Sequence, residues 1–230
     1  MIARTRPYID TQQAERFLKK YKTRSNNLSD NVFFLNSGQA CLSVFLKCFQ
    51  KEQRVGIQVF TCPTVLNAIT EAGCEPVFLD ISRDYFSSTL VDIEAIIDNI
   101  DVLVLTHVFG IPNPEYLQIK KLCKDKNVII IDDLCQTYHA KVNGAYIEDL
   151  SENYFYSFFY DKPIPCASGG MLKVDTSLHN KIASFVDEYP KEYDIEGRRK
   201  IRRLINVQNL LDPDVYKKEF RTGNIFETYL

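Results

Sequence analysis

Short apolar runs alternate with helical stretches through the central part of this chain, and that alternation limits the folds open to it. The clearest run, Val128-Ile129-Ile130-Ile131, is apolar on consecutive positions, which is typical of a strand buried on both faces. Chains that alternate strand and helix in this way form layered α/β domains around a largely parallel sheet. We therefore expect a three-layer α/β fold with a mostly parallel central sheet.

The predicted elements follow from periodicity and from capping signals. Ser37 is expected to cap the helix that follows it, and Gly73 to stop the next helix. The predicted strands are 32–35, 55–60, 76–81, 101–107, 127–132, 154–158 and 170–174. The predicted helices are 38–49, 63–72, 91–99 and 114–126, followed by an amphipathic helix at 176–189.

Three regions of the chain differ in character. Residues 1–30 are polar, and we interpret them as an N-terminal arm with a helix near 11–21. Residues 31–175 carry the strand and helix alternation and form the expected large domain. Residues 176–230 are expected to form a short helical C-terminal segment. Its basic run, 198–203, is more typical of a solvated helix face than of a phosphate site.

Composition excludes several classes of protein. The formal net charge of −2 gives no overall attraction to nucleic acid. The seven cysteines include no C-x-x-C pair, which favours reduced thiols in a cytoplasmic protein over a disulfide framework. The N-terminus lacks the apolar core of a signal peptide, and no apolar run reaches the length of a membrane span. We expect neither a membrane nor a nucleic-acid partner.

Three polar segments, 36–39, 132–136 and 157–162, follow predicted strands, and ligands bind beyond the carboxyl ends of parallel strands. They contribute the Ser37-Gly38 helix start, the Asp133 carboxylate and the Lys162 amine. Each has an ordinary alternative. Ser37-Gly38 could be a plain helix cap, Asp133 a capping or metal-binding carboxylate, and Lys162 a solvated surface charge. Together, an anion-binding helix start, a carboxylate and an amine are the groups that hold pyridoxal phosphate (PLP).

The chemistry of PLP explains why these residue types matter. A carboxylate such as Asp133 keeps the pyridine nitrogen protonated, which makes the cofactor an electron sink. The amine of Lys162 must lose its proton part of the time to form an imine, and the neighbouring Phe158 and Phe159 favour this by desolvation. The three histidines show no metal-ligand spacing, so no metal is expected. The glycine-rich nucleotide motifs and the hydrolase elbow are absent from the sequence.

Five blocks, in order, resemble the DegT-type aminotransferases, PLP enzymes of fold type I that act on nucleotide sugars. The resemblance extends from about residue 31 to residue 174. The blocks are Leu35-Asn36-Ser37-Gly38-Gln39-Ala40; residues 60–69 with Ala72-Gly73, Pro76-Val77-Phe78 and Asp80; His107-Val108-Phe109-Gly110-Ile111-Pro112; Ile131-Asp132-Asp133-Leu134-Cys135-Gln136; and Ser157-Phe158 with Lys162 and Gly169-Gly170.

The resemblance implies a phosphate site, in which one residue of this chain differs from the family's usual residue. The helix start at Ser37, Gly38 and Gln39 would bind the cofactor phosphate through backbone amides, together with Ser157. Gln39 stands where relatives usually have Thr or Ser, so a short hydroxyl is missing from this phosphate cup.

The resemblance also implies contacts to the cofactor ring. Asp133 would meet the pyridine nitrogen, Gln136 the phenolic oxygen, and Lys162 would be the catalytic Schiff-base lysine. Cys62 occupies the position where an aromatic side chain often stacks on the ring. A lysine at position 162, where one relative has histidine and performs dehydration, favours transamination.

As a function, the resemblance implies transfer of an amino group, expected from glutamate, to a keto-sugar nucleotide for surface-polysaccharide or related sugar biosynthesis. Family members are generally homodimers and carry a C-terminal small domain, of which 176–230 would be a shortened form. The alternative is a relative that binds PLP or a partner without turnover. Another PLP activity, dehydration or a lyase reaction, is a third hypothesis. The sequence indicates neither the sugar, the nucleotide nor the carbon that is aminated.

Overall fold

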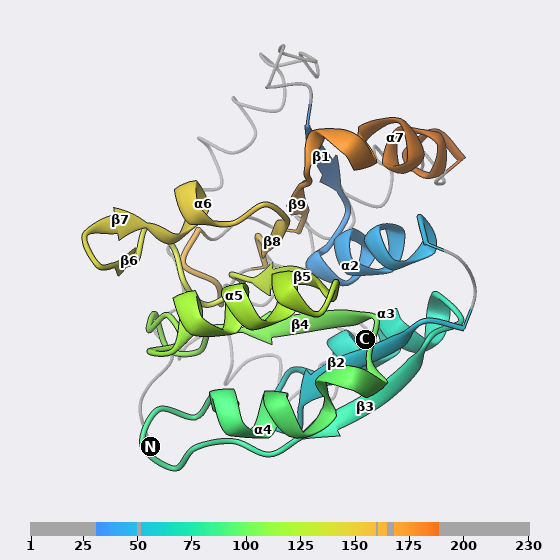
Figure 1. Cartoon of the computed structure of the whole chain (residues 1–230). Coiled ribbons are helices and arrows are strands. Elements are labelled where there is room, and N and C mark those ends of the chain that lie inside the picture. The colour runs from blue at the N-terminus through green and yellow to red at the C-terminus, as the bar shows by residue number, and fades with distance from the viewer. Residues whose placement is uncertain (1–30, 50–51, 160, 165–167, 189–230) are drawn as a thin grey trace, which may run out of the picture. The chain divides into compact units, whose positions relative to one another are not determined.

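The computed structural model describes residues 31–49, 52–159, 161–164 and 168–188 (Figure 1). These residues all lie in one compact unit, Asn27–Tyr189. The predicted helix at 11–21 and the basic run at 198–203 lie outside the described residues. No helix in the described ranges is long and apolar enough to cross a membrane.

Seven strands form one sheet in the order β1-β9-β8-β5-β4-β2-β3. Their bounds are β1 Val32–Leu35, β2 Arg54–Gln58, β3 Glu75–Leu79, β4 Val102–Thr106, β5 Ile129–Asp133, β8 Tyr154–Ser157 and β9 Gly170–Lys173. From β8 to β3 all neighbours are parallel, whereas β9 runs antiparallel to both β8 and β1. The predicted α/β fold with a mostly parallel sheet is confirmed.

Helices connect the strands. The α-helices in the described ranges are α2 Gly38–Lys47, α3 Pro63–Glu71, α4 Leu90–Ile96, α5 Tyr116–Asp125, α6 Ile147–Leu150 and α7 His179–Glu188. Two 3₁₀ turns, η1 Ile97–Asn99 and η2 Thr176–Leu178, and a small hairpin of β6 Lys141–Val142 and β7 Ala145–Tyr146 complete the fold. The hairpin and α6 were not predicted, because elements this short carry too few residues to show a period.

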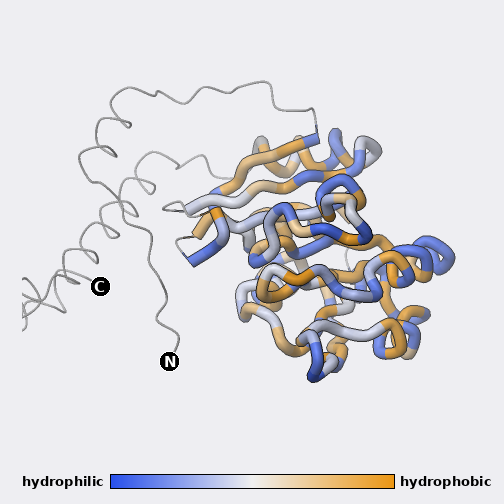
Figure 2. Tube along the Cα trace, turned by 90° about the vertical axis from the view of Figure 1, so that its left-hand side faces the viewer, coloured by the Kyte–Doolittle hydropathy of each residue, from blue (hydrophilic) through white to orange (hydrophobic). Residues whose placement is uncertain are grey.

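Strand β4 shows how the three layers arise. Successive side chains of a strand point to opposite faces. Val102 and Val104 accordingly pack in the hydrophobic cluster that contains α2 and α3, whereas Leu103 and Leu105 pack in the cluster that contains α4, α5 and α6. Helices therefore cover both faces of the sheet (Figure 1). Hydrophobic segments run through the middle of the domain in Figure 2, and hydrophilic ones lie mostly outside.

Most predicted elements differ from the structure by one or a few residues at an end, and two of these differences have clear local reasons. The strand predicted at 127–132 begins at Ile129, because Asn127 has a φ of +57° and belongs to the turn that ends α5. Helix α4 begins at Leu90, one residue earlier than predicted. Thr89 caps it in a capping box with Asp92, in which each side chain bonds the other residue's backbone N–H.

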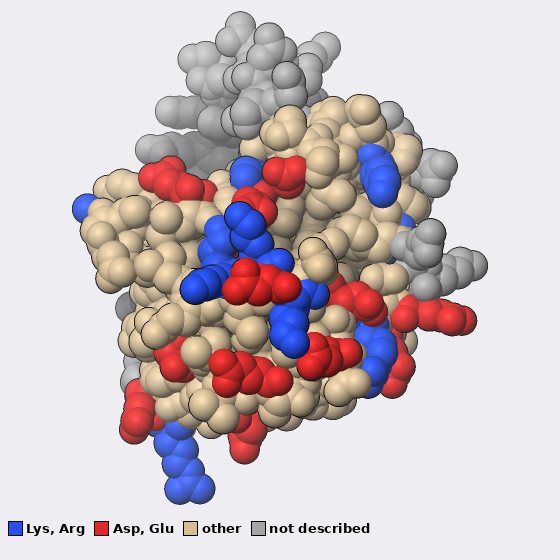
Figure 3. Space-filling view, in the orientation of Figure 1, with Lys and Arg blue, Asp and Glu red and all other residues tan. Residues whose placement is uncertain are grey.

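The outer face formed by α4 and α5 carries charges of both signs. Lysines lie among acidic side chains there (Figure 3), and Lys126 forms an ion pair with Asp98 at 2.8 Å. Such a mixed surface has no extended region of one sign, so it produces little long-range attraction.

Candidate active site

The three polar segments that the sequence analysis selected converge at one edge of the sheet. Gly38 opens α2, Asp133 ends β5 and Ser157 ends β8. A Cβ atom placed on Gly38 would lie 3.0 Å from the Cβ of Ser157 and 3.3 Å from the Sγ of Cys135. The helix start thus packs directly against the ends of two parallel strands, which is where such sheets bind ligands.

Gly170 explains the glycine pair after Lys162. A Cβ atom on Gly170 would come within 2.5 Å of both the carbonyl carbon and oxygen of Ser37. No side chain fits in that space, because the obstacle is backbone. Gly169 has a φ of +129° and forms a bridge to Ser37. Both glycines are therefore required to bring β9 against the start of α2.

Ser37 is the N-cap of α2, as predicted. Its hydroxyl accepts a hydrogen bond from the N–H of Ala40 at 3.0 Å, and its carbonyl accepts one from the N–H of Cys41 at 3.1 Å. The first N–H groups of a helix have no acceptor within the helix. The amides of Gly38 and Gln39 are therefore available to an anion, and the helix dipole favours negative charge at this end.

Asp133 is the buried carboxylate of this site. It is 5% exposed, and its Oδ1 accepts a hydrogen bond from the N–H of Cys135 at 3.0 Å. Burial raises the pKa of the Asp133 carboxyl above its usual value, and hydrogen bonds from Cys135 and the charge of Lys162 offset part of that rise. A buried carboxylate of this kind is stabilised by a cationic partner.

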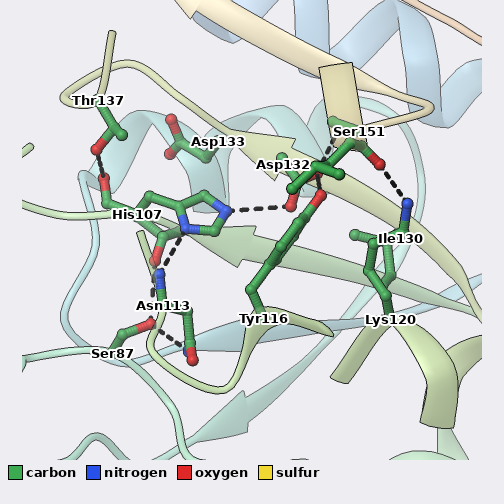
Figure 4. Close-up of polar contacts among 12 residues, drawn as sticks. Ser87, His107, Asn113, Tyr116, Lys120, Ile130, Asp132, Asp133, Thr137 and Ser151 are labelled. Carbon is green, nitrogen blue, oxygen red and sulfur yellow. Dashed lines mark hydrogen bonds and ion pairs between the residues drawn. The ribbon is translucent and has the colours of Figure 1, made fainter. Parts of the chain in front are cut away.

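The neighbouring carboxylate, Asp132, belongs to a different environment on the opposite face of β5. Its Oδ2 accepts hydrogen bonds from the hydroxyls of Tyr116, at 2.8 Å, and Ser151, and its Oδ1 lies 3.1 Å from Nε2 of His107 (Figure 4). Burial raises the pKa of Tyr116, and the charge and hydrogen bond of Asp132 raise it further. Asp132 is thus surrounded by donors.

His107 has a defined tautomer in this network. Its Nδ1 accepts a hydrogen bond from the backbone N–H of Asn113 at 3.0 Å, so the ring proton of the neutral form is on Nε2 and points to Asp132. Thr137 donates to the His107 carbonyl at 3.0 Å. His107 is fully buried, and its contacts hold the loop after β4 in place.

The remaining predicted residues lie in more exposed positions. Gln136 is exposed, and its Oε1 accepts a hydrogen bond from the N–H of Phe109 at 3.2 Å. The side chain of Gln39 donates to Glu71 at 2.8 Å. Cys62 is the exposed N-cap of α3, without a capping hydrogen bond, and its Sγ accepts from the hydroxyl of Thr64 at 3.1 Å. Lys162 is half-buried.

Cys135 lies among these candidate residues, although no role was predicted for it from the sequence. Its N–H and thiol both bond to Asp133, and its Sγ lies beside Gly38. Burial, together with the charge and hydrogen bond of Asp133, raises the pKa of Cys135 well above the usual value, so the thiol is neutral. Its place one residue before Gln136 in the Asp-Asp-Leu-Cys-Gln block was the available signal.

The donor set fits PLP. Because Gly38 and Gly170 have no side chains, the backbone at the start of α2 is open to a phosphate group. Asp133 offers a buried carboxylate to a ring N–H⁺. No cluster of His, Cys, Asp and Glu suited to a metal ion is found within the described residues.

Residues 8–194 match the DegT/DnrJ/EryC1/StrS aminotransferase family, and the chain belongs to this family. It is 30% identical over 122 residues to GDP-perosamine synthase of Escherichia coli O157:H7, a match that covers 52% of this chain and 33% of the relative. It is 26% identical over 151 residues to UDP-N-acetyl-3-dehydro-alpha-D-glucosamine 3-aminotransferase of Acidithiobacillus ferrooxidans, covering 64% and 41%. The chain thus spans less than half the length of these two relatives.

The fold has solved counterparts that contain the cofactor. The structure of E. coli GDP-4-keto-6-deoxy-D-mannose-3-dehydratase with bound hydrated PLP superposes with a TM-score of 0.58 at 19% identity, over 76% of this chain and 44% of that one. At this identity the similarity shows the fold alone.

Proposed function

We propose that this protein is a PLP-dependent aminotransferase that transfers an amino group, from glutamate as donor, to the keto group of a nucleotide sugar. The observation that carries the proposal is the position of Asp133. It is a buried carboxylate at the end of β5, on the same edge of the sheet as the start of α2 and Ser157, and the charge of Lys162 acts on it. We further propose that it works as a cytoplasmic homodimer in the synthesis of surface polysaccharide or related sugars.

Four groups would hold the cofactor. The amides of Gly38 and Gln39 and the hydroxyl of Ser157 would bind its phosphate at the start of α2. Asp133 would hold the proton on the ring nitrogen, and the thiol and N–H of Cys135 orient its carboxylate. Lys162 would hold the cofactor covalently through Nζ. Gln136, fixed by the N–H of Phe109, would contact the phenolic oxygen.

Bound PLP supplies an electron sink for the charge that develops when a proton leaves the carbon bearing the amino group. The part left to the protein is proton transfer at that carbon. Lys162 Nζ is the candidate base, because Lys162 lies close enough to Asp133 for its charge to act on that carboxylate.

The substrate class follows from the family and from its named relatives. Two of them act on, or make, sugars carried on GDP or UDP, according to their names. Because a lysine rather than a histidine occupies position 162, amino transfer is favoured over dehydration.

Borohydride reduction of the purified protein tests the proposal. We expect a yellow protein that bleaches on reduction, with the added mass on the peptide that contains Lys162. Lys162→Ala should lose the adduct, whereas Lys124→Ala, which removes an exposed lysine of α5, should keep it. Colourless protein that takes up no added PLP would overturn the proposal. If the protein binds PLP but glutamate never converts the bound PLP to its amine form, the alternative of binding without turnover is supported.

A further inference from the structure

Three phenylalanines from separate parts of the sequence meet on the surface of the domain. Phe60, Phe86 and Phe109 are 45%, 43% and 60% exposed. Their ring centroids are 6.0 Å apart for Phe60 and Phe86, 6.1 Å for Phe60 and Phe109, and 5.7 Å for Phe86 and Phe109. These distances are those of aromatic rings in mutual contact. We call these three side chains the phenylalanine platform.

The platform lies at the same edge of the sheet as the candidate active site. Phe60 follows β2, Phe86 lies between β3 and α4, and Phe109 follows β4, so all three come after the carboxyl ends of parallel strands. The N–H of Phe109 donates to Gln136, a predicted cofactor-binding residue, at 3.2 Å. The platform is therefore connected to the site by a direct hydrogen bond.

Two of the three residues have strained backbones. Phe86 has a φ of +58° and Phe109 a φ of +57°, in the left-handed region that bulky side chains avoid. Such a conformation costs on the order of 1–3 kcal/mol per residue and is concentrated at functional sites. Exposing an aromatic ring to water adds to that cost. Folding alone therefore gives no reason to display these rings.

Buried polar groups hold the platform from below. The side chain of Gln58, 2% exposed, donates through Nε2 to the carbonyls of Phe60 at 2.6 Å and Phe86 at 3.2 Å. Two carbonyl acceptors fix which end of the amide is nitrogen. The Oε1 of Gln58 and the Oγ1 of Thr61 are buried without a hydrogen-bond partner within the described residues. Gln58 thus fixes the backbones of two platform residues relative to each other.

We infer that the phenylalanine platform stacks the heterocyclic base of the substrate's nucleotide. The inference rests on the proposed function, which supplies a nucleotide sugar at this edge of the sheet. A base offers a flat π-face to the rings, and stacking on them is worth about 1–3 kcal/mol. Every base has a π-face, so such a subsite contributes affinity without selecting one base.

A contact with a second copy of the chain is the competing use of an exposed apolar patch. Each partner of a stable interface buries about 800 Å². Three rings exposed to this degree supply roughly 100 Å² each, and the flanking Val59 and Ile111 are single exposed side chains. The small area and the strained backbones favour a small planar ligand.

Calorimetric titration of the PLP-loaded protein with GDP, UDP and ADP tests the inference. We expect Phe60→Leu and Phe109→Leu each to weaken binding of all three nucleotides by about 5- to 100-fold. Inorganic pyrophosphate, which has no base, should bind equally to all variants. Phe78→Leu is the matched control, because Phe78 is 53% exposed on β3 outside the platform, and it should bind like the wild type. Unfolding midpoints verify that the variants fold.

Nucleotide affinities that are equal in the wild type and both platform variants would overturn the inference, as would a wild type that binds none of the three. If the variants bind nucleotides normally but sediment as a smaller species, the platform is a contact between copies. Failure of the proposed function gives a different result. In that case the protein takes up no PLP, and the same nucleotide titrations, carried out on the protein without PLP, still decide the role of the platform.

Discussion

Two adjacent carboxylates at the end of β5, Asp132 and Asp133, occupy opposite environments. Asp132 faces α5 and α6 and receives hydrogen bonds from Tyr116 and Ser151, with His107 as its third partner. Asp133 faces the α2 side and is bonded only by Cys135 among the described residues, while the charge of Lys162 acts on it. A carboxylate that is surrounded by hydrogen-bond donors of its own protein stabilises the fold. One that is buried with few partners is suited to a ligand.

The two faces also use different means to hold their geometry. The Asp132 face is a network of side chains, in which removing one member leaves buried polar groups unpaired. The Asp133 face is set by backbone contacts, since Gly38 and Gly170 bring the start of α2 against β8 and β9. Side-chain losses should therefore damage stability on the first face, and added atoms should damage it on the second.

Asp132→Ala should produce the largest loss of stability. It leaves the hydroxyls of Tyr116 and Ser151 and the Nε2–H of His107 buried without their acceptor. Removing one partner of a buried network of this kind costs about 3–5 kcal/mol in the free energy of unfolding. Urea denaturation measures the loss, and Asp125→Ala, an exposed position on α5, is the control. A loss below about 1 kcal/mol would mean that Asp132 is not the centre of the network.

Gly170→Ala should destabilise the protein by about 1–3 kcal/mol and reduce PLP uptake. The new Cβ would meet the backbone of Ser37 at 2.5 Å, so the start of α2 must move. Gly56→Ala is a matched control, because its Cβ would meet the end of the Ile100 side chain at 2.9 Å, which can rotate away. Equal PLP uptake by both variants would show that the start of α2 is not part of the site.

Tyr116→Phe should have a smaller effect on stability. It removes one hydrogen bond to Asp132 and leaves the buried ring in place, which costs about 1.5 kcal/mol for a bond to a charged acceptor. Tyr146→Phe, at an exposed residue, should change the free energy of unfolding very little. A Tyr116→Phe protein as stable as the wild type would place the strength of the network in His107 and Ser151.

Asp133→Asn should have the smallest effect on stability, and in the opposite direction, while abolishing the proposed transamination. The pKa of Asp133 is raised from 3.8 by burial, so above pH 3.8 the folded protein binds more protons at this site than the unfolded chain. Its contribution to stability therefore falls as pH rises from 3.8 to the raised pKa and is constant above it. The gain from asparagine should grow across that window. A gain that shrinks with rising pH would show that the Asp133 pKa is lowered.

Much of the fold could be predicted from local patterns. The apolar run 128–131 marked a buried strand, Ser37 marked the start of α2, and strand and helix alternation indicated a parallel sheet. The same apolar run also predicted that this strand ends near Asp133. These features depend on neighbours in sequence, which is why the chain alone shows them.

The remaining features depend on contacts between distant segments. The sequence alone determined that two carboxylates end a buried strand and that an amine, a glycine pair and a capped helix start accompany them. Only the tertiary structure decided which carboxylate faces α2. The alternation of side chains along a strand puts the two carboxylates on opposite faces, but it does not say which helices cover each face. It also brought together Phe60, Phe86 and Phe109, whose loops meet because β2, β3 and β4 are neighbours in a sheet whose order the chain does not state.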